Sequence, residues 1–302
     1  GLYLALVGGT IVLLGLMTSF GALVRVTRNP RFPMYVSLLT NVLNALFSGL
    51  GIYVFRLGIV GVALGTVLAR LVGVLILWRE LDLSTIRWSW GLDRELLRLS
   101  LPAAGERLMM RAGDVVIIAI VVVFGTDAVA GNAIGEVLTQ FNYMPAFGVA
   151  TATVMLVAHA VGEGDMQAVG QIRQRAFWLS FACMLPLALG IFALGRPLTL
   201  LYTDNSGAIT ASLSVILFSL LGTPMAVGTV IYTAVWQGLG NARLPFYATT
   251  IGMWLIRIVS GYLLGVTLGL GLPGVWAGTL LDNGFRWLFL KVLFDRKMRE
   301  IA

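Results

Sequence analysis

The sequence predicts an all-α protein that crosses a membrane many times, and three observations support this fold class. Of the 302 residues, 58% are hydrophobic and only 12% are charged, whereas an ordinary soluble domain has roughly 25% charged residues. Apolar runs of about 20 residues, long enough to cross a bilayer, recur along the whole chain. These runs carry no polar face, so we interpret them as lipid-embedded helices rather than as helices buried in a soluble core.

Nine such runs can be counted, and each predicts one transmembrane helix. In chain order they are Leu2–Ala22, Pro33–Phe55, Ile59–Trp78, Leu101–Phe124, Ala128–Leu156, Ala176–Leu194, Ala211–Leu239, Pro245–Leu268 and Gly274–Phe294. The single cysteine, Cys183, and the single histidine, His159, form no ligand cluster by themselves. We therefore expect no certain metal site and no cofactor.

Basic residues are concentrated in alternate loops between the predicted helices. One set of loops and the C-terminus hold Arg25, Arg28, Arg31, Arg79, Arg87, Arg94, Arg98, Arg173, Arg175, Arg243, Arg296, Lys297 and Arg299. The other set holds only Arg56 and Arg196. Because Arg and Lys collect in cytoplasmic loops, this 13-to-2 bias predicts a cytoplasmic C-terminus. It also accounts for much of the net charge of +7 without a nucleic-acid partner.

Two stretches of the sequence repeat after slightly more than 200 residues. Leu57–Leu68 (LGIVGVALGTVL) and Leu270–Leu281 (LGLPGVWAGTLL) share seven of twelve positions at an offset of 213. Asn29–Tyr35 and Asn241–Tyr247 share Asn, Arg, Pro and Tyr at an offset of 212. The arginine distribution places the paired loops on the same side of the membrane, which indicates a parallel repeat.

The repeat predicts half of one six-helix lobe followed by a complete second lobe. We expect residues 1–78 to form the last three helices of an N-terminal lobe, 79–100 a cytoplasmic amphipathic linker, and 101–302 a six-helix C-terminal lobe. About three further helices should then precede Gly1 in the intact protein, and residues 1–302 alone should not transport. Duplicated lobes are typical of carriers that alternate access between them.

Three carboxylates are expected at similar depth in the C-terminal lobe. At 1.5 Å per residue, Asp114, Glu136 and Asp282 fall about 18–20 Å above the cytoplasmic boundary. Charges at such depth are costly and mark functional sites by default, and carboxylates there could exchange protons or bind a hard cation. The alternative is local neutralisation, of Asp114 by Arg111 and of Glu136 or Asp282 by Arg257.

For the other polar and aromatic residues of interest, a structural role is an alternative to a functional one. Glu106, Arg107 and Arg286 are expected near the cytoplasmic boundary, where long side chains reach water. Candidates for the wall of a cavity that accepts flat cationic compounds are Met110, Tyr143, Met144, Tyr232, Trp236 and Trp254. Aromatic faces attract cations and methionine adapts its shape, although packing between helices is the alternative for each.

The order of several motifs resembles that of the multidrug and toxic compound extrusion (MATE) family. In the first part of the chain they comprise Asn41, Asn44, Leu57, Gly58, Gly61, Val62, Gly65, Thr66, Leu101 and Pro102. In the second part they comprise Gly125–Ile134 (GTDAVAGNAI), Asn142–Ala152 (NYMPAFGVATA), Val161–Asp165 (VGEGD) and Gly274–Trp276 (GVW). The resemblance covers nearly the whole chain, as helices four to twelve of twelve.

The resemblance implies a non-enzymatic antiporter that alternates access between two six-helix bundles. Such a protein exports small organic cations in exchange for sodium ions or protons, here as a monomer among the lipids of a prokaryotic inner membrane. Some members bind a cation in the N-terminal lobe, where Asn44 and Thr66 match but Ser48 replaces an acid. Others use an acid where Met110 stands, so Asp114, one turn further along, is a candidate substitute.

Two other functions remain open from the sequence. A flippase for lipid-linked oligosaccharides of the same superfamily would need arginines facing a pyrophosphate, whereas the three acids outnumber Arg257 at that depth. A membrane-embedded prenyl transferase would need metal-binding carboxylates grouped at a membrane face, and the sequence shows no Asp-rich motif.

Overall fold

The computed structural model describes residues 8–27, 31–81 and 94–301. Every regular element in these ranges is a helix, and six helices are long and apolar enough to cross a membrane. The predicted all-α, multi-pass fold is therefore confirmed. Residues 2–7 of the first predicted span, residues 82–93 of the predicted linker, and Arg28 and Arg87 lie outside the described ranges.

The chain divides into two compact units, Gly1–Gly91 and Leu92–Ala302. The first contains α2 (Ile11–Thr27), α3 (Phe32–Gly49), the π-helix η1 (Leu50–Val54) and α4 (Ile59–Glu80). The second contains α5 (Arg94–Val122), α6 (Thr126–Gly162), α7 (Met166–Ala193), α8 (Gly195–Leu200), α9 (Ser206–Gly238), α10 (Arg243–Ile251), η2 (Gly252–Arg257), α11 (Ile258–Tyr262), η3 (Leu263–Thr267) and α12 (Leu272–Ile301).

Within the described ranges, nine long helical stretches follow the nine predicted spans. Joining α3 to η1, and α10 to η2, α11 and η3, gives two of these stretches; α2, α4, α5, α6, α7, α9 and α12 give the others. Three stretches lie outside the six apolar spans: α2, which is a shorter apolar helix, and α5 and α12. The last two are less apolar because they hold the ionisable residues of the candidate site.

Helix starts were the least accurate part of the prediction. The span predicted from Ala176 begins ten residues earlier, at Met166, because Asp165 caps α7 and accepts a hydrogen bond from the Ala168 amide at 2.9 Å. Asn205 caps α9 in the same way. Caps of this kind stabilise a helix by about 1 kcal/mol, and they extend both helices beyond their apolar runs.

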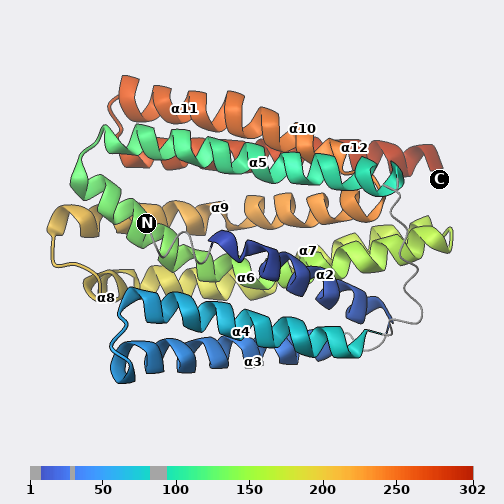
Figure 1. The fold of residues 1–302 in the computed structure, drawn as a ribbon. Helices are drawn as coiled ribbons and strands as arrows, with labels where there is room; N and C mark the ends of the chain where they lie inside the picture. The colour runs from blue at the N-terminus through green and yellow to red at the C-terminus, as the bar shows by residue number, and fades with distance from the viewer. Residues whose placement is uncertain (1–7, 28–30, 82–93, 302) are drawn as a thin grey trace. The chain divides into compact units, whose positions relative to one another are not determined.

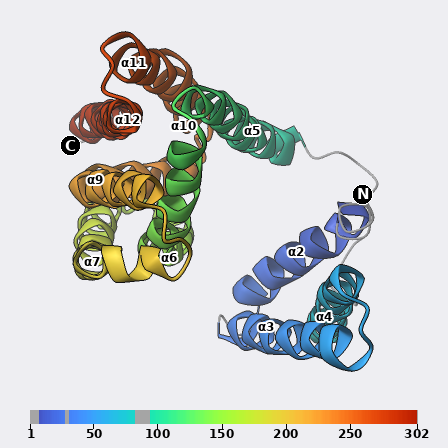
Figure 2. The same cartoon turned by 90° about the vertical axis from the view of Figure 1, so that its left-hand side faces the viewer.

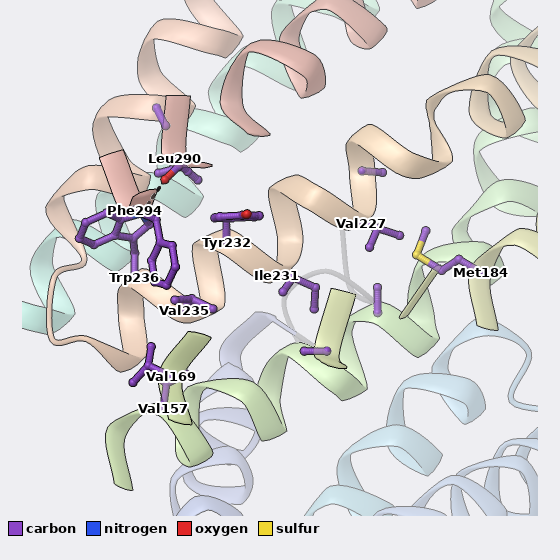
Figure 3. Packing of buried hydrophobic residues seen from close by; sticks show 14 of the residues in the cluster. Val157, Val169, Met184, Val227, Ile231, Tyr232, Val235, Trp236, Leu290 and Phe294 are labelled. Atoms are coloured by element: carbon purple, nitrogen blue, oxygen red, sulfur yellow. Dashed lines mark hydrogen bonds between the residues drawn. The ribbon is translucent and has the colours of Figure 1, made fainter. Parts of the chain in front are cut away.

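The second unit is organised around α9, which contacts α6, α7 and α12. Figures 1 and 2 show α5 beside the α10–η3 stretch, with α12 next to both α9 and that stretch. The main core joins α6, α7, α9 and α12 through side chains such as Val157, Val169, Ile231 and Phe294 (Figure 3). Many outward apolar side chains remain uncovered, as expected where lipid replaces water as the solvent.

The two copies of the sequence repeat share an unusual backbone. The π-helices η1 and η3 begin at Leu50 and Leu263, at the same offset of 213 as the repeated motif. Each is followed by a glycine with positive φ, Gly58 at 54° and Gly271 at 64°. Arg56 has a φ of 52°, and the residue at the equivalent position of the second copy is a glycine that also has positive φ. These matches support a duplication of structure as well as of sequence.

Glycines of the repeated motif bring neighbouring helices into backbone contact. A Cβ at Gly61 would lie 2.7 Å from the carbonyl carbon of Gly51, and a Cβ at Gly274 would lie 2.6 Å from the amide nitrogen of Gly265. Small residues allow such close approach between membrane helices. The motif that revealed the repeat therefore encodes the tight helix pairing in each copy.

The two copies differ by one inserted residue, and its place can be identified. Tyr35 and its counterpart Tyr247 are 212 residues apart. Further along, Ser48 and Gly261 are counterparts 213 residues apart, because the amide nitrogen of Ser48 lies beside Gly65 just as that of Gly261 lies beside Gly278. Between these points the first copy is regular α-helix, whereas the second contains η2. A π turn closes over one more residue than an α turn, so η2 accommodates the additional residue.

Replacement of Gly274 by alanine should destabilise the lobe. The new Cβ would meet the Gly265 backbone, which cannot move aside like a side-chain tip, so we expect a loss of about 1–3 kcal/mol. Gly190→Ala in α7 is the matched control, since a Cβ there meets nothing within 4 Å and alanine favours helix. Thermal unfolding of the purified protein in detergent should show a lower midpoint only for Gly274→Ala; equal midpoints would contradict the contact.

Candidate functional site

One face of α5 carries Glu106, Met110 and Asp114 at four-residue spacing, so these side chains lie one above another. We call these three residues the α5 polar row. In the same lobe α5 contacts α10, η2, α11 and α12, and each member of the row contacts a different residue on these elements. Two of the three acids predicted as coupling candidates, Asp114 in the row and Asp282 through Arg286, are connected to this row.

Asp114 lies between two arginines. Its Oδ2 is 3.4 Å from Nη1 of Arg111, as the sequence predicted, and its Oδ1 is 3.7 Å from Nη1 of Arg257 at the end of η2. The Arg111 side chain is 84% exposed but that of Arg257 only 13%, so the contact with Arg257 is the less screened of the two. The expectation that Arg257 pairs with Glu136 or Asp282 is therefore wrong.

Asp282 and Arg286 form a buried ion pair one turn apart on α12. Their side chains are 0% and 3% exposed, and Arg286 Nε donates a hydrogen bond to Asp282 Oδ1 at 2.6 Å. Arg286 also reaches Met110, with Nη1 at 3.5 Å from Sδ. The Arg286 side chain does not reach water, contrary to the expectation for a long side chain near the boundary, because a buried carboxylate requires an opposite charge beside it. The pair gives Arg286 a structural role.

The absence of a side chain at Gly252 makes room for this pair. A Cβ at that position, the first residue of η2, would overlap the Asp282 carboxylate and approach the Arg286 side chain within 3.0 Å. Glu106, at the other end of the α5 polar row, accepts a hydrogen bond from Thr249 Oγ1 at 3.2 Å. The row therefore contacts α10, η2 and α12 at successive turns.

Glu136 lies apart from this network. Its Oε1 accepts a hydrogen bond from Asn132 Nδ2 at 3.1 Å, and Asn132 Oδ1 accepts one from Trp276 Nε1 at 2.9 Å. These contacts connect α6 to α12 through neutral groups. Within the described ranges, no group of three or more acids, cysteines or histidines is placed to hold a metal, so the three acids predicted at one depth do not gather into one cluster.

Asn44 and Thr66 are brought together in the first unit. Asn44 Oδ1 accepts hydrogen bonds from Thr66 Oγ1 at 3.3 Å and from Ser48 Oγ at 3.0 Å. The three polar side chains connect α3 with α4. Asn44 and Thr66 thus meet as the resemblance implied, while a hydroxyl occupies the place where that pattern has a carboxylate.

Within the described ranges, the six candidates for a cavity wall lie in different surroundings. Met110 contacts Arg286, and Tyr143 is half-buried on α6. Met144 and Trp254 are 52% and 37% exposed. Trp236 is buried in the main core, where Nε1 donates to the Leu290 carbonyl at 3.1 Å (Figure 3).

Tyr232 lies elsewhere, at the wall of a cleft of about 270 Å³ between α7, α9 and α12. Its hydroxyl accepts a hydrogen bond from Arg173 Nη1 at 2.6 Å. The aromatic candidates are thus divided between core, cleft and exposed helix surface.

The structure also shows polar residues that sequence reasoning did not single out. Thr249 contacts Glu106, and Trp276 contacts Asn132, across more than 140 residues, so no local pattern could reveal these two contacts. The contact of Asn132 with Glu136, four residues apart on α6, follows from helix spacing. Asn142 is buried, and neither polar atom of its amide has a hydrogen-bond partner within the described ranges. Arg286 could have been found, because it lies four residues after Asp282 and so on the same helix face.

The long apolar helices define a polytopic α-helical membrane protein, and the matched π-helices and glycines indicate an internal repeat. The MatE family model matches residues 102–263. The chain belongs to the MatE family, which confirms the resemblance seen in its motifs.

Relatives and solved structures agree with this assignment. The chain is 30% identical over 294 residues to "Probable multidrug resistance protein NorM" of Thermotoga maritima, and the match covers 92% of this chain and 62% of that protein. It is 25% identical to "Uncharacterized transporter YisQ" of Bacillus subtilis, covering 95% and 66%. The chain therefore spans about two thirds or less of the length of these relatives.

Two solved structures show the same fold at low identity. One, described as the outward-facing conformation of a multidrug resistance MATE family transporter of the MOP superfamily, has a TM-score of 0.89 at 20% identity and covers 99% of this chain. The other, a MOP superfamily transporter from Pyrococcus furiosus whose binding pocket is described as having reverse polarity, has a TM-score of 0.89 at 19% identity and covers 98%. The chain covers 69% of each.

Removal of one member of the Asp282–Arg286 pair should be strongly destabilising. Asp282→Asn or Arg286→Met leaves a buried charge without its partner, which costs about 3–5 kcal/mol. The double variant Asp282→Leu with Arg286→Met should recover most of this loss, because it removes both charges. The midpoints of thermal unfolding in detergent measure the stability of all three variants. A double variant no more stable than the single variants would contradict the view that charge neutralisation is the main role of the pair.

Proposed function

We propose that the intact protein is a cation-coupled exporter of small organic cations, and that Asp114 takes part in coupling. The observation that carries this proposal is the contact of Asp114 with Arg257 across two helices. Asp114 is 32% exposed, so an ion or a cationic compound can reach it, whereas the fully buried Asp282 is occupied by Arg286. Relatives named as multidrug resistance proteins support this class of function over an enzyme.

The proposed mechanism uses competition for one carboxylate. A proton, a sodium ion or an organic cation at Asp114 would weaken its attraction to Arg257, and this loosens the contact between α5 and η2. A ligand shifts a conformational equilibrium only by its difference in affinity for the two states. The ion pair supplies such a difference, because only the state with the pair broken offers the free carboxylate.

The π-helix η2 fits this role. π-helical turns are frequent at functional sites, and η2 carries Arg257 at one end and the space-giving Gly252 at the other. A change at Asp114 therefore acts on the same turn that packs against Asp282. We propose that α5 and η2 move relative to each other during transport, while the buried pair on α12 stays intact.

Other parts of the proposal rest on sequence and resemblance. Asn44, with Thr66, is a candidate for a second cation site in the N-terminal lobe, where oxygen ligands suit a hard cation. Glu136, hydrogen-bonded to a neutral amide, is a further candidate for proton exchange. We place the protein as a monomer in a prokaryotic inner membrane with a cytoplasmic C-terminus, as the arginine distribution favours.

A second candidate function is movement of a lipid-linked anionic substrate. The sequence disfavoured this function because three acids were compared with Arg257 alone. Arg286, which lies beside Asp282 in the structure, was not included in that comparison. Arg257 is also only partly engaged, since its Nε is buried without a hydrogen-bond partner within the described ranges. The reverse polarity described for the Pyrococcus furiosus transporter is a precedent for different chemistry on this fold.

Asp114→Asn should reduce gradient-driven efflux about tenfold while leaving the fold intact. The experiment uses the complete gene product in energised inverted membrane vesicles, with ethidium as the transported cation and separate proton and sodium gradients. If the contact with Arg257 contributes about 1.4 kcal/mol to the free-energy difference between the two transport states, its loss lowers the efflux rate about tenfold. The gradient that supports wild-type transport identifies the coupling ion.

Glu163→Gln is the matched control, because Glu163 is an exposed acid whose ion pair in the described part of the chain is with His159, one turn away. It should transport like the wild type. Efflux by Asp114→Asn at the control rate would remove Asp114 from the mechanism. If well-folded wild type transports no organic cation under either gradient, the anionic-substrate function takes its place.

A further inference from the structure

The cleft between α7, α9 and α12 is distinct from the α5 polar row. Its volume is about 270 Å³, which is enough for a small polar group. The stacked rings of Phe177 and Trp287, with centroids 5.8 Å apart, connect α7 and α12 in its wall. Trp287 lies against Gly228 of α9, where a Cβ would overlap its indole. The cleft is thus shaped by fixed aromatic packing.

The charge of the cleft is basic. Arg173 and Lys291 line it, and the one acid that pairs with either of them in the described part of the chain, Asp295, is 3.8 Å from Arg173. Within the described ranges Lys291 makes no ion pair or hydrogen bond, and Arg173 Nε is buried without a hydrogen-bond partner. Positive charge thus exceeds negative charge, which opposes an organic cation and favours an anion.

Arg173 is held in position by its neighbours. Nη1 donates to the Tyr232 hydroxyl at 2.6 Å, and the guanidinium lies 5.3 Å from the centroid of the Phe294 ring. Its side chain keeps 23% exposure, so part of it faces the cleft or its mouth. A fixed arginine loses little conformational freedom on meeting an anion.

The helix surface beside the cleft is apolar and uncovered. Trp178, at the cleft itself, is 58% exposed on α7, and Leu288 and Val292, each next to a cleft-lining residue of α12, are 57% and 48% exposed. A soluble anion would gain nothing from this surface, whereas acyl chains would cover it. Tryptophan is also enriched where membrane helices meet the lipid headgroups.

The cleft lies toward the end of the lobe where α7 begins and where α9 and α12 end. Arg175 of α7 and Arg296, Lys297 and Arg299 of α12 lie toward the same ends, and Arg243 begins α10 shortly after α9 ends. These are among the residues that predict the cytoplasmic side. Basic pockets between transmembrane helices on that side bind anionic headgroups. The depth of the cleft therefore suits a phosphodiester at the membrane surface with its chains directed into the bilayer.

We propose that this cleft binds an anionic phospholipid of the cytoplasmic leaflet. Lys291 and Arg173 contact the phosphate, and Trp178 with the neighbouring aliphatic side chains contacts the acyl chains. The bound lipid joins α7 to α12 on the side of the lobe that the α5 polar row does not use. The leaflet rests on the proposed topology, but lipid binding is independent of which substrate is transported.

Native mass spectrometry of the intact transporter tests this site. The purified protein is exchanged into detergent with phosphatidylglycerol and phosphatidylcholine in equal amounts, and the ratio of the two bound lipids is measured. Wild type should retain phosphatidylglycerol preferentially. Lys291→Gln should reduce this preference about fivefold, since one basic residue near an anionic headgroup has an effect of that size.

Arg175→Gln is the matched control, because Arg175 is an exposed basic residue on α7 that does not line the cleft. It should retain the wild-type ratio. Equal loss of preference in Lys291→Gln and Arg175→Gln, or no loss in either, would overturn the proposal. Arg173→Gln is a second variant, in which a further loss supports the site if circular dichroism shows a folded protein.

A separate arm distinguishes a lipid from a soluble phosphoester. Glycerol 3-phosphate is added at millimolar concentration to wild type with phosphatidylglycerol bound. Retention of the lipid supports the proposal, because the acyl chains contribute to binding. Complete displacement would assign the cleft to a free phosphoester instead and overturn the lipid assignment.

Discussion

The need to neutralise every buried charge governs the arrangement of the C-terminal lobe. Hydrocarbon does not solvate a carboxylate, so Asp282 can be buried in α12 only with Arg286 beside it. That pair in turn needs space, which Gly252 provides, and a soft neighbour, which Met110 provides. The packing of α5 and η2 against α12 therefore follows from one acid and the groups that balance it.

The sequence predicted the helical fold and most spans because membrane helices need long apolar runs, and these are visible without structural information. It also predicted the repeat, since the glycines that allow close backbone contact are the residues that recur. Helix starts were less accurate, because a capping residue such as Asp165 extends a helix past its apolar run. A polar cap carries little weight in a hydropathy pattern.

The candidate site was only partly predictable. Local pairing of Asp114 with Arg111 follows from spacing along one helix, and so does the pair of Asp282 with Arg286, although the sequence interpretation overlooked it. The contact of Asp114 with Arg257 joins residues 143 positions apart and depends on how α5 packs against η2. Depth estimates placed three acids at one level, but depth alone does not say which side of a helix faces which neighbour.

The π turn at η2 bears on how the two copies of the repeat came to differ. Adding one residue to a regular helix would rotate everything beyond it by about 100°, which would turn the glycine contacts of the repeat away from their partners. The wider turn absorbs that rotation, so the downstream glycines keep their places and the change stays local. The two copies thus tolerate a difference of one residue in length while their glycine contacts stay in register, and the residues of η2 are the place where the copies are free to differ.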